Sequence, residues 1–514
     1  MKTVSFKIVM ALLLVVSFVY LACNKKELNV PPVTVTELSY FKTESEFRRA
    51  AIGAYASIID YYSAANHGGG SAGTGGSSMF EIWFKPADDI STTNTKGDVW
   101  EYFGGLDPSA SKLDQAYRSS YILIGRANKV IVKLREADPA IFVTSGLRET
   151  IEGEMLFLRS FAHYMLWNLF GTAPVDTIVV TSQDQIGLPS SKGNELLDQA
   201  ITDLTKAIAQ LPESWPESET GRITKNAALG LLGKVQVFKA SSEKNPAAYQ
   251  SAVDAFNQIS GLSLTADFYD NFKEETENNS ESLFEFQAGK NISGNGGNTW
   301  LANDACDCGT AGTSFQMFYE GSNGGSSNGI WRPTPKLISA FEAGDPRMEV
   351  TIDPDPATPR KFIKYVVGGD KTDGSPEISI NNFRILRYAD VLLLKAEAIL
   401  KSGGSKSDAI AAINEVRTRA RNGGTVPADF STAETDETTI MQWIMDERLR
   451  ELAGEGQRWF DLRRWHMAGY ITLDNAFFGS LNPGDMEFDA KYLYFPIPLT
   501  ETSRNVNIIQ NPGY

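Results

Sequence analysis

Two glycine-rich patterns associated with catalysis occur in residues 68–73, which read GGGSAG. One is GxGxxG, which binds the phosphates of a dinucleotide when it joins a strand to a helix. The other is GxSxG, which presents a serine nucleophile when it forms a sharp strand-to-helix turn. A helical pattern ending in Tyr61-Tyr62 precedes the tract, and no strand pattern does. The context therefore favours neither nucleotide binding nor serine chemistry.

Histidines and paired carboxylates form no recognisable catalytic set either. The chain has three histidines, His67, His163 and His466, with no HExxH pattern and no pair at ligand spacing. His163 lies in an apolar helical stretch, which favours a core residue over a base or a ligand. Glycosidases need two facing carboxylates, but pairs such as Asp88-Asp89 are common in any acidic chain. The pattern favours binding or structure over hydrolysis.

Cys23 is placed where a lipid could be attached. A basic start and an apolar run at 8–21 precede it, as in an export signal. The run is shorter than the roughly 20 residues of a membrane-spanning helix. The Ala22-Cys23 junction resembles a bacterial lipoprotein cleavage site, in which the thiol is acylated, although Tyr20 stands where a small aliphatic residue is usual. The alternative is an ordinary secretory signal with an incidental cysteine.

The lipoprotein interpretation divides the chain into a signal peptide at 1–22, a lipidated tether at 23–40 and a folded domain at 41–514. Removing residues 1–22 removes Lys2 and Lys7, so that 46 basic residues face 63 acidic ones and the net charge is −17. Such a balance argues against nucleic acids and anionic lipid surfaces as partners.

The two remaining cysteines, Cys306 and Cys308, have CxC spacing, with Asp304 and Asp307 beside them. A structural zinc site would need a further pair of thiolates or imidazoles, and none is near in the sequence. The sequence therefore predicts no metal and no cofactor, and a loop with a strained or absent disulfide is the favoured interpretation.

Most of the chain has the apolar periodicity of amphipathic helices. We expect single long helices at 44–62, 113–134, 149–171 and 194–212, and two helix pairs, 224–242 with 247–260 and 387–403 with 407–424. Small Ala and Gly positions on the apolar sides of the pairs would let two helices approach closely. The pairs loosely resemble tetratricopeptide units.

The region 262–382 differs from the helical remainder. It contains short strand-like runs, SLFEFQAG and KFIKYVV, among Gly, Asn, Ser and Pro. A loop-rich insertion of this length is usually functional or disordered. A second Gly/Ser tract lies at 67–78.

Four motifs follow one another in the C-terminal third: RYADVLLLKAEAI, INEVRTRA, ERLRELAGEGQRWFDLRRW and FPIP…QNPGY. In this order they resemble the SusD/RagB family of outer-membrane nutrient-binding lipoproteins. The N-terminal half agrees, because residues 47–55 resemble the family's opening helix and Ala87-Asp88-Asp89 its early acidic turn. Residues 117–131 resemble its YxxxYxxIxxAN-type helix, and EGEMLFLRSFAHYMLWNLFGTAPV its next helix.

The resemblance implies a mainly α fold on four tetratricopeptide-like helix pairs, with an irregular loop-rich ligand-binding region and short strands. It also implies a SusC-like TonB-dependent outer-membrane barrel as partner, with this protein lipid-anchored and facing the cell exterior. The implied function is capture of a nutrient, most often an oligosaccharide or polysaccharide, without enzymatic activity. The alternatives are peptide capture, as in RagB-like relatives, and a helical surface glycosidase.

Sugar binding suits the aromatic and polar residues of the loops. A pyranose ring stacks on indole or phenol rings, and its hydroxyls need amide, carboxylate or arginine partners. The candidate ligand-binding residues are Asn94, Trp100, Tyr102, Asn298, Trp300, Tyr319, Trp331 and Arg332. The alternative for each tryptophan is core packing.

The arginines of ERLRELAGEGQRWFDLRRW are expected to have a structural role. Arginine pairs with carboxylates through two parallel hydrogen bonds, so we interpret Arg448, Arg458, Arg463 and Arg464 as fastening the last helix and its turn to the repeats. The alternative is an anion-binding cluster. The terminal QNPGY is expected to pack back on the body of the protein.

Overall fold

The computed structural model describes residues 40–62, 81–91, 100–101, 103, 106–288, 331–354, 360–365, 381–479 and 488–514. The described helices are α2 (Glu44–Tyr55), α3 (Ile59–Tyr62), α4 (Glu81–Phe84), α5 (Ser111–Glu136), α6 (Leu147–Phe170), α7 (Glu195–Gln210), α8 (Lys225–Glu243), α9 (Pro246–Phe256), α11 (Pro335–Ala340), α12 (Arg347–Thr351), α13 (Tyr388–Lys401), α14 (Lys406–Ala420), α15 (Glu437–Glu451), α16 (Arg458–Ala468), α17 (Asn475–Gly479) and α18 (Leu499–Arg504). The described strands are β1 (Ile90–Ser91), β2 (Ser282–Phe286), β3 (Arg332–Pro333) and β4 (Phe383–Arg387).

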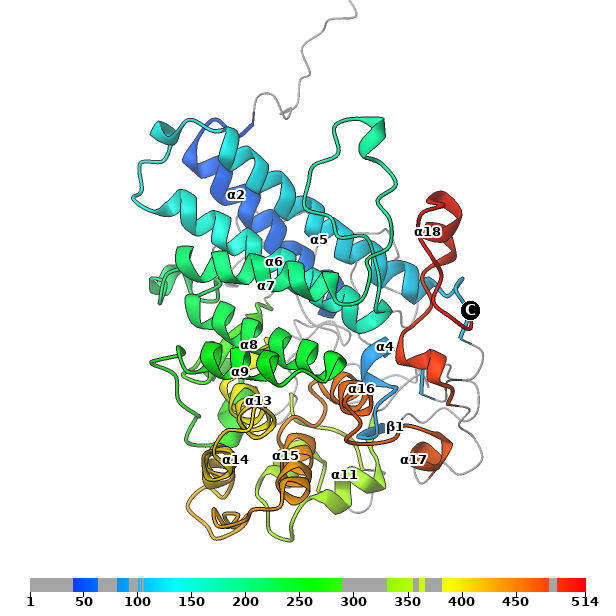
Figure 1. The fold of residues 1–514 in the computed structure, drawn as a ribbon. Helices are drawn as coiled ribbons and strands as arrows, with labels where there is room; N and C mark the ends of the chain where they lie inside the picture. The colour runs from blue at the N-terminus through cyan, green and yellow to red at the C-terminus, as the bar shows by residue number, and fades with distance from the viewer. Residues whose placement is uncertain are drawn as a thin grey trace, which may run out of the picture.

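Helix pairs stacked side by side make up the scaffold. α2 packs on α5, α6 on α7, α8 on α9 and α13 on α14, and each pair also contacts the next. Figure 1 shows the stack running from α2 and α5 at the top to α14 at the bottom, with α4, α16, α17 and α18 along the right. The predicted mainly α fold and all eight predicted helices are confirmed, although a 3-10 turn, η1 (Ala56–Ile58), divides the first.

Local sequence explains where these helices begin, end and approach one another. Thr43 and Glu46 form a capping box at the start of α2. Gly171, with φ of 71°, ends α6 in a conformation that favours glycine. A Cβ atom at Gly233 would lie 2.2 Å from the Phe256 ring, so only glycine lets α8 lie this close to α9.

Two small antiparallel ribbons accompany the helices. β1 pairs with β3 in the register Ile90↔Pro333 and Ser91↔Arg332. β2 pairs with β4, with irregularities next to Phe284. The predicted strand in SLFEFQAG is therefore confirmed. In the run KFIKYVV, Phe362 makes only an isolated bridge to Ile352, and residues 366–367 lie outside the described part.

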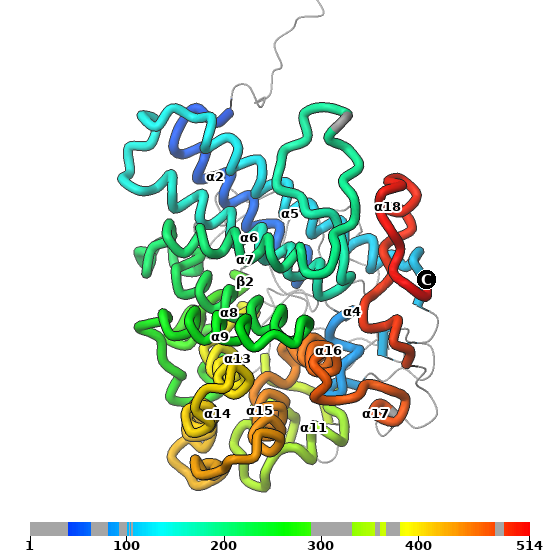
Figure 2. The backbone as a smooth tube through the Cα atoms, in the orientation of Figure 1, coloured from blue at the N-terminus to red at the C-terminus, as the bar shows by residue number. Residues whose placement is uncertain are grey.

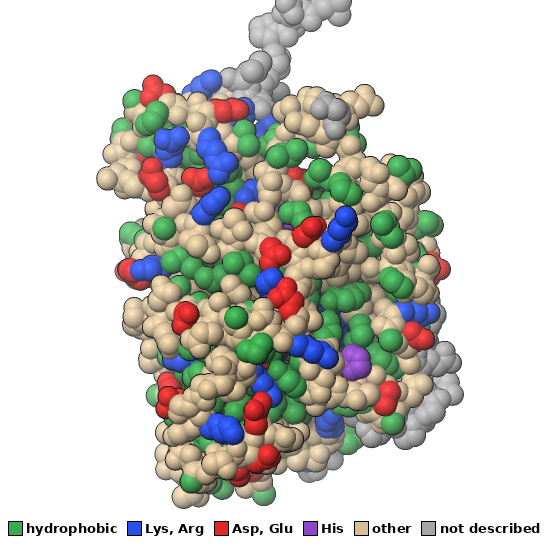
Figure 3. All heavy atoms as spheres, viewed as in Figure 1, with side chains coloured by type: hydrophobic (Ala, Val, Ile, Leu, Met, Phe, Trp, Pro, Cys, Tyr) green, Lys and Arg blue, Asp and Glu red, His purple; other side chains and the backbone are tan. Residues whose placement is uncertain are grey.

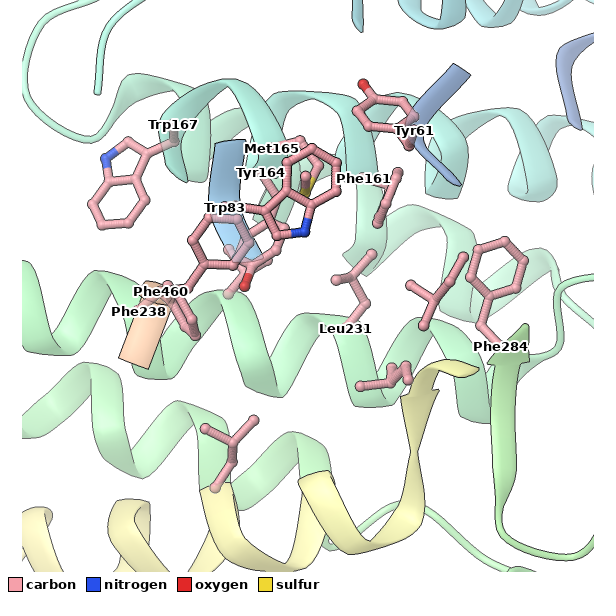
Figure 4. Packing of buried hydrophobic residues seen from close by; sticks show 14 of the residues in the cluster. Tyr61, Trp83, Phe161, Tyr164, Met165, Trp167, Leu231, Phe238, Phe284 and Phe460 are labelled. Atoms are coloured by element: carbon pink, nitrogen blue, oxygen red, sulfur yellow. The ribbon is translucent and has the colours of Figure 1, made fainter. Parts of the chain in front are cut away.

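Aromatic side chains from distant segments fill the core between the helix stack and α16. Figure 4 shows Trp83 and Phe460 against the α6 residues Phe161 and Tyr164. His163 is fully buried, as predicted, and burial, with a smaller contribution from Arg159, lowers its pKa to about 3. Neither ring nitrogen of His163 has a hydrogen-bond partner among the described residues, so this histidine is a neutral core residue.

The arginines of the C-terminal motif are buried and paired with carboxylates. Arg448 donates from Nη1 to Asp390 of α13 and from Nε to Asp461 of α16, both at 2.8 Å. Arg464 pairs with Asp461 and with Glu397 of α13. The predicted structural role is confirmed, because these guanidinium groups hold α15 and α16 against α13.

A second ion-pair network centres on Glu451, at the end of α15. Its carboxylate accepts from Arg347 Nη1 at 2.9 Å, from Arg387 Nη1 at 2.6 Å and from Arg419 Nη2. Arg387 also pairs with Glu281 at 2.8 Å. All five side chains are buried, so the network joins α12, β4, α14 and α15 inside the protein.

The C-terminal segment closes the exposed end of α6. The last carbonyls of a helix have no partner within it. In this protein Gly171 N donates to Trp167 O at 2.9 Å, and Arg463 Nη1 donates to Asn168 O. Phe495 N donates to Leu169 O at 2.8 Å, and Asn511 Nδ2 donates to Phe170 O at 2.8 Å. The predicted packing of QNPGY on the body is confirmed, and we name this arrangement the α6 clasp.

Within the described ranges, no helix is both long enough and apolar enough to cross a membrane.

Candidate ligand-binding site

The segments that carry the predicted ligand residues begin and end at one region of the scaffold. Residues 92–99 lie between Ser91 and Trp100, and residues 289–330 end at Trp331. Because Ser91 pairs with Arg332 in the β1–β3 ribbon, these two segments meet at the same ribbon end. The carbonyl of Trp331 also accepts from Phe362 N at 3.3 Å. The strand-like run that precedes residues 366–380 therefore lies beside Trp331 as well.

The ends of the other segments lie at the same place. Ala288 N donates to Asn382 Oδ1 at 2.7 Å, and Asn381 Nδ2 donates to Tyr365 O at 3.1 Å. Tyr62, which precedes residues 63–80, stacks on Phe383 with ring centroids 4.9 Å apart. The described residues that flank 63–80, 92–99, 289–330 and 366–380 therefore lie on a shared base, which we call the loop base.

Trp100 and Trp331, two of the predicted stacking residues, lie in the hydrophobic core. Trp331 has 0% of its surface exposed, and its ring lies 5.1 Å from that of Phe84. Trp100 is 6% exposed, and its ring meets the Phe495 ring edge-on at 5.6 Å. A ring enclosed in this way offers no face to a sugar, so the structure corrects both predictions in favour of core packing.

Among the predicted ligand residues that the structure describes, Arg332 keeps part of its surface exposed. It lies in β3 and is half-buried, and its buried Nε has no hydrogen-bond partner among the described residues. A guanidinium group presents five donors in a fixed plane. Because its side chain is only half-buried, Arg332 remains a candidate for donating to the hydroxyl or carboxylate groups of a ligand.

The other predicted residues, Asn94, Tyr102, Asn298, Trp300 and Tyr319, lie outside the described residues, as do Cys23, Cys306 and Cys308. No group of three or more His, Cys, Asp and Glu side chains in the described ranges could hold a metal ion.

Two polar residues beside the ribbon escaped the sequence analysis. Ser91 Oγ donates to Glu101 Oε1 at 2.9 Å, which places a carboxylate next to the strand that pairs with Arg332. The position of Glu101, between Trp100 and Tyr102, was the available signal.

The acidic turn Asp88-Asp89 fixes the loop base to the scaffold. Asp88 pairs with Arg458 Nε at 2.5 Å and with Lys336 at 2.6 Å, while Asp89 Oδ2 accepts from Gly454 N at 3.1 Å. Thr334 Oγ1 donates to the Asp88 carbonyl at 2.7 Å. These bonds tie β1 to β3 and to the start of α16, so the resemblance to the family's acidic turn has a structural basis.

The two neighbouring carboxyl groups have opposite pKa shifts. Burial alone would raise the pKa of Asp88, but Arg458 and Lys336 outweigh it and lower the pKa to about 2. Burial, and then the Asp88 carboxylate, raise the pKa of Asp89 to about 6, against the opposing effect of the Gly454 N–H.

We expect Asp89→Asn to stabilise the protein at neutral pH. The folded pKa of about 6 lies above the ordinary value of 3.8, so the folded state holds this proton more tightly than the unfolded state. Ionisation of Asp89 therefore reduces stability as pH rises from about 4 to 6. The gain in unfolding free energy of Asp89→Asn over the parent should grow over that interval from near zero to about 2–3 kcal/mol.

Urea denaturation of both proteins between pH 4 and pH 8 measures this difference. Asp254→Asn, at an exposed position, controls for the loss of one surface charge. A constant difference between Asp89→Asn and the parent at all pH values would contradict the assignment.

An internal cavity near the loop base is too small to be the ligand site. It has a volume of about 30 Å³ and is lined by aromatic rings, including Trp83 and Phe460 (Figure 4), and by Lys234 and Glu455. A buried water needs roughly 10–15 Å³, so the cavity can hold about two waters and no sugar ring.

Comparisons with known proteins identify the family. The sequence model of the SusD family matches residues 356–514, and a second model, described as starch-binding associating with outer membrane, matches residues 46–237. The SusD-like protein P2 of Formosa agariphila is 26% identical over 523 residues, which cover 96% of this chain and 97% of that protein.

Solved structures show the same fold. A laminarin-binding SusD-like protein superposes with a TM-score of 0.69 at 23% identity, covering 92% of this chain and 100% of that one. The surface glycan-binding protein A of Bacteroides fluxus gives a TM-score of 0.71 at 23% identity, with the same coverage. The two family matches, the relative that spans nearly the whole chain and the shared fold lead to one conclusion: this chain belongs to the SusD family.

Proposed function

We propose that this protein is a cell-surface lipoprotein that binds an oligosaccharide or polysaccharide at the loop base and delivers it to a SusC-like TonB-dependent outer-membrane barrel. The observation that carries the proposal is that the described residues flanking 63–80, 92–99, 289–330 and 366–380 lie on one base, where the half-buried Arg332 has an Nε without a hydrogen-bond partner among the described residues. Proteins of the same fold named for laminarin and surface-glycan binding support a glycan as the ligand.

Binding at this site requires no bond to be broken. The polar side chains described at the ribbon include the Arg332 guanidinium group, the Ser91 hydroxyl and the Glu101 carboxylate, while the neighbouring Asp88 and Asp89 carboxylates are held by Arg458, Lys336 and Gly454. Glycoside hydrolysis uses two carboxyl groups on opposite sides of the scissile bond. We therefore propose capture and release of the intact glycan.

Affinity gel electrophoresis with laminarin, starch and other polysaccharides tests the function. Retardation without release of reducing sugars supports capture, whereas sustained product release would indicate a glycosidase. Binding of peptides in place of glycans would favour the RagB-like alternative.

Arg332→Ala is expected to weaken glycan binding by about 1.5–3 kcal/mol, the usual contribution of a hydrogen bond to a charged group. Thermal stability should change little, because Arg332 is half-buried and forms no ion pair among the described residues. Arg135→Ala, which removes an exposed arginine paired with Glu152, is the matched control. Titration calorimetry with the best glycan from the gel screen measures the difference. Equal affinity of Arg332→Ala and the parent would remove Arg332 from the site.

Cys23→Ala is expected to release the protein from the outer membrane into a soluble fraction. An acyl chain contributes about 0.8 kcal/mol per buried CH₂ group, and more than one chain is needed for durable anchoring. Fractionation of cells that express the parent or the variant measures this. Unchanged retention of Cys23→Ala in washed membranes would contradict lipidation at this residue.

A further inference from the structure

Trp443 of α15 is one of two described tryptophans that reach the surface of the protein. The other described tryptophans are buried: Trp83, Trp100, Trp167, Trp331, Trp459 and Trp465. The second half-buried tryptophan, Trp215, is already engaged, because its Nε1 donates to Ile223 O at 2.9 Å and Arg222 Cζ lies 3.7 Å from its ring centroid. Trp443 makes no hydrogen bond to any described residue, so its indole N–H is available to another molecule.

Phe430, in the connection between α14 and α15, covers one face of the Trp443 indole. The two ring centroids lie 4.2 Å apart, and the ring planes differ by 2°. Arg417 Cζ lies 4.0 Å from the Phe430 centroid, on the face of that ring which the indole leaves open. Both faces of Phe430 are therefore covered, whereas the exposed part of Trp443 belongs to its outer face and its edge. We call Arg417, Phe430 and Trp443 the aromatic platform.

Helix geometry indicates which side chain lies beside the outer face of the indole. Because a helix has about 3.6 residues per turn, Glu447 and Asp446 lie on opposite sides of Trp443 on α15. Arg417 Nη1 donates to Glu447 Oε2 at 2.9 Å, so Phe430 stacks on the Glu447 side of the indole. The outer face of Trp443 therefore turns toward Asp446, which is half-buried.

Hydrogen bonds behind the aromatic platform hold it rigid. Phe430 N donates to Asn414 Oδ1, and Asn414 Nδ2 donates to Phe430 O, both at 2.8 Å. Arg417 Nε donates to Ala428 O at 2.6 Å, and Arg417 Nη2 donates to Glu342 Oε1, also at 2.6 Å. A surface that is already ordered loses little conformational entropy when a ligand binds, so these bonds favour binding on the platform.

The aromatic platform is separate from the loop base. Figure 2 shows the connection between α14 and α15 at the lower end of the molecule, at the opposite end from α2. The two surfaces are joined through α11, because β3 of the loop base precedes this helix and Glu342, which is bonded to Arg417, follows it. A glycan chain that reached both surfaces would bind more tightly than at either one, since its second contact would be intramolecular.

The polar side chains beside the indole suit a neutral sugar better than a nucleotide or an acidic sugar. Gln442, which is exposed, donates from Nε2 to Asp446 Oδ1 at 2.8 Å. Together the amide and the carboxylate offer both donors and acceptors to hydroxyl groups. Residues 422–446 contain five acidic residues and no Lys or Arg, and Figure 3 shows acidic side chains over α15 in the lower part of the view. A phosphate group or a sugar acid would be repelled at this surface.

We propose that the aromatic platform is a second carbohydrate-binding site, at which one neutral sugar unit stacks on Trp443 while its hydroxyls bond to Asp446 and Gln442. The indole combines a flat apolar face with a polar N–H group, which matches the C–H face and the hydroxyls of a pyranose ring. This inference rests on the proposed function, because it assumes that the protein binds glycans. It adds a surface on α14 and α15 that would hold a long polysaccharide outside the loop base.

Fluorine NMR of the full-length protein labelled with 5-fluorotryptophan tests the site. The Trp443 and Trp215 resonances are assigned from the variants Trp443→Phe and Trp215→Phe. Titration with laminarihexaose or maltohexaose, which are short and neutral, is expected to shift the Trp443 resonance. The Trp215 resonance is the matched control and should stay in place, because its N–H group and one ring face are already engaged. An anionic hexagalacturonate should bind the platform about tenfold or more weakly.

Two variants separate stacking from hydrogen bonding. Trp443→Ala is expected to weaken retardation by laminarin or starch in affinity gels about fivefold or more, the lower end of what an aromatic stack contributes to nucleobase binding. Asp446→Asn keeps the shape but loses the charge, and it should raise the midpoint of the Trp443 shift about threefold or more. Asp254→Asn, which alters the similar pair with Gln250 on α9, is the matched control and should leave that midpoint unchanged.

The variant Arg332→Ala distinguishes a failure of this inference from a failure of the proposed function. If the platform is a separate site, the midpoint of the Trp443 shift is the same in Arg332→Ala as in the parent. Glycan retardation that Trp443→Ala leaves unchanged, with no shift at Trp443, would overturn the platform and leave the proposed function standing. A Trp443 shift caused by polyproline and by no glycan would also overturn the platform. Absence of retardation by any polysaccharide would defeat the proposed function, and this inference with it.

Discussion

Replacing Glu451 by alanine is expected to lower the free energy of unfolding by about 3–5 kcal/mol, because it leaves buried guanidinium groups without their carboxylate. Glu451 accepts from Arg347, Arg387 and Arg419, and all four side chains are buried. Burial alone would raise the pKa of Glu451, but Arg419, Arg387 and Arg347 outweigh it and hold the pKa well below its usual range. The stabilisation is thus fully present above about pH 4.5 and is lost as pH falls through the lower folded value.

Denaturant unfolding at pH 7 measures the effect. Glu451→Gln keeps the shape and one acceptor oxygen but removes the charge, so it should also destabilise the protein. Glu437→Ala, which breaks the exposed pair with Lys401, is the control and should cost no more than about 1 kcal/mol. A Glu451→Ala protein as stable as the parent would contradict the central role of this network.

Replacing Trp331 by alanine is the second change with a large expected effect, about 3–5 kcal/mol of lost stability. The indole is fully buried against Phe84, and its removal leaves a cavity at the loop base. Trp331→Phe should retain most of the stability, since it keeps an aromatic ring in contact with Phe84.

The comparison of stability with glycan affinity distinguishes the two roles of this residue. If Trp331 is a core residue, Trp331→Ala lowers the unfolding midpoint, and Trp331→Phe binds glycan as the parent does. If Trp331→Ala instead unfolded like the parent and lost glycan binding, the original interpretation as a stacking residue would be restored.

Much of the helical scaffold could be predicted because its signals are local. The expected helix at 149–171 corresponds to α6 at Leu147–Phe170, since apolar periodicity and the terminal Gly171 define both ends. The small Ala and Gly positions of the predicted helix pairs likewise indicated close packing, and Gly233 is such a position between α8 and α9. Signals of this kind depend on neighbours within a few residues.

The charge partners could not be predicted, because they come from distant segments. The motif ERLRELAGEGQRWFDLRRW indicated arginine–carboxylate pairing, and Arg448 and Arg464 confirm it. Nothing local to Glu451 indicates Arg347, which precedes it by 104 residues, or Arg387, which precedes it by 64. The sequence thus indicated that pairs exist without indicating which ones.

At the candidate site too, local sequence does not indicate the contacts that distant segments make. Trp331 follows a glycine-rich stretch and has the local sequence of a loop residue, but its burial is decided by Phe84, almost 250 positions earlier. Arg332, its neighbour, is only half-buried in β3. These two adjacent residues therefore differ in burial, and only tertiary contacts decide which of them is buried.

The α6 clasp has a consequence for the order of events during biosynthesis. Phe170 and Asn511, which it joins, are 341 residues apart. At about 5–20 residues per second, the ribosome needs roughly 20–70 s to reach Asn511 after it has made Phe170. Throughout that interval the Phe170 carbonyl lacks the Asn511 donor that it has in the folded protein, so the α6 clasp can form only after the last residues of the chain have been made.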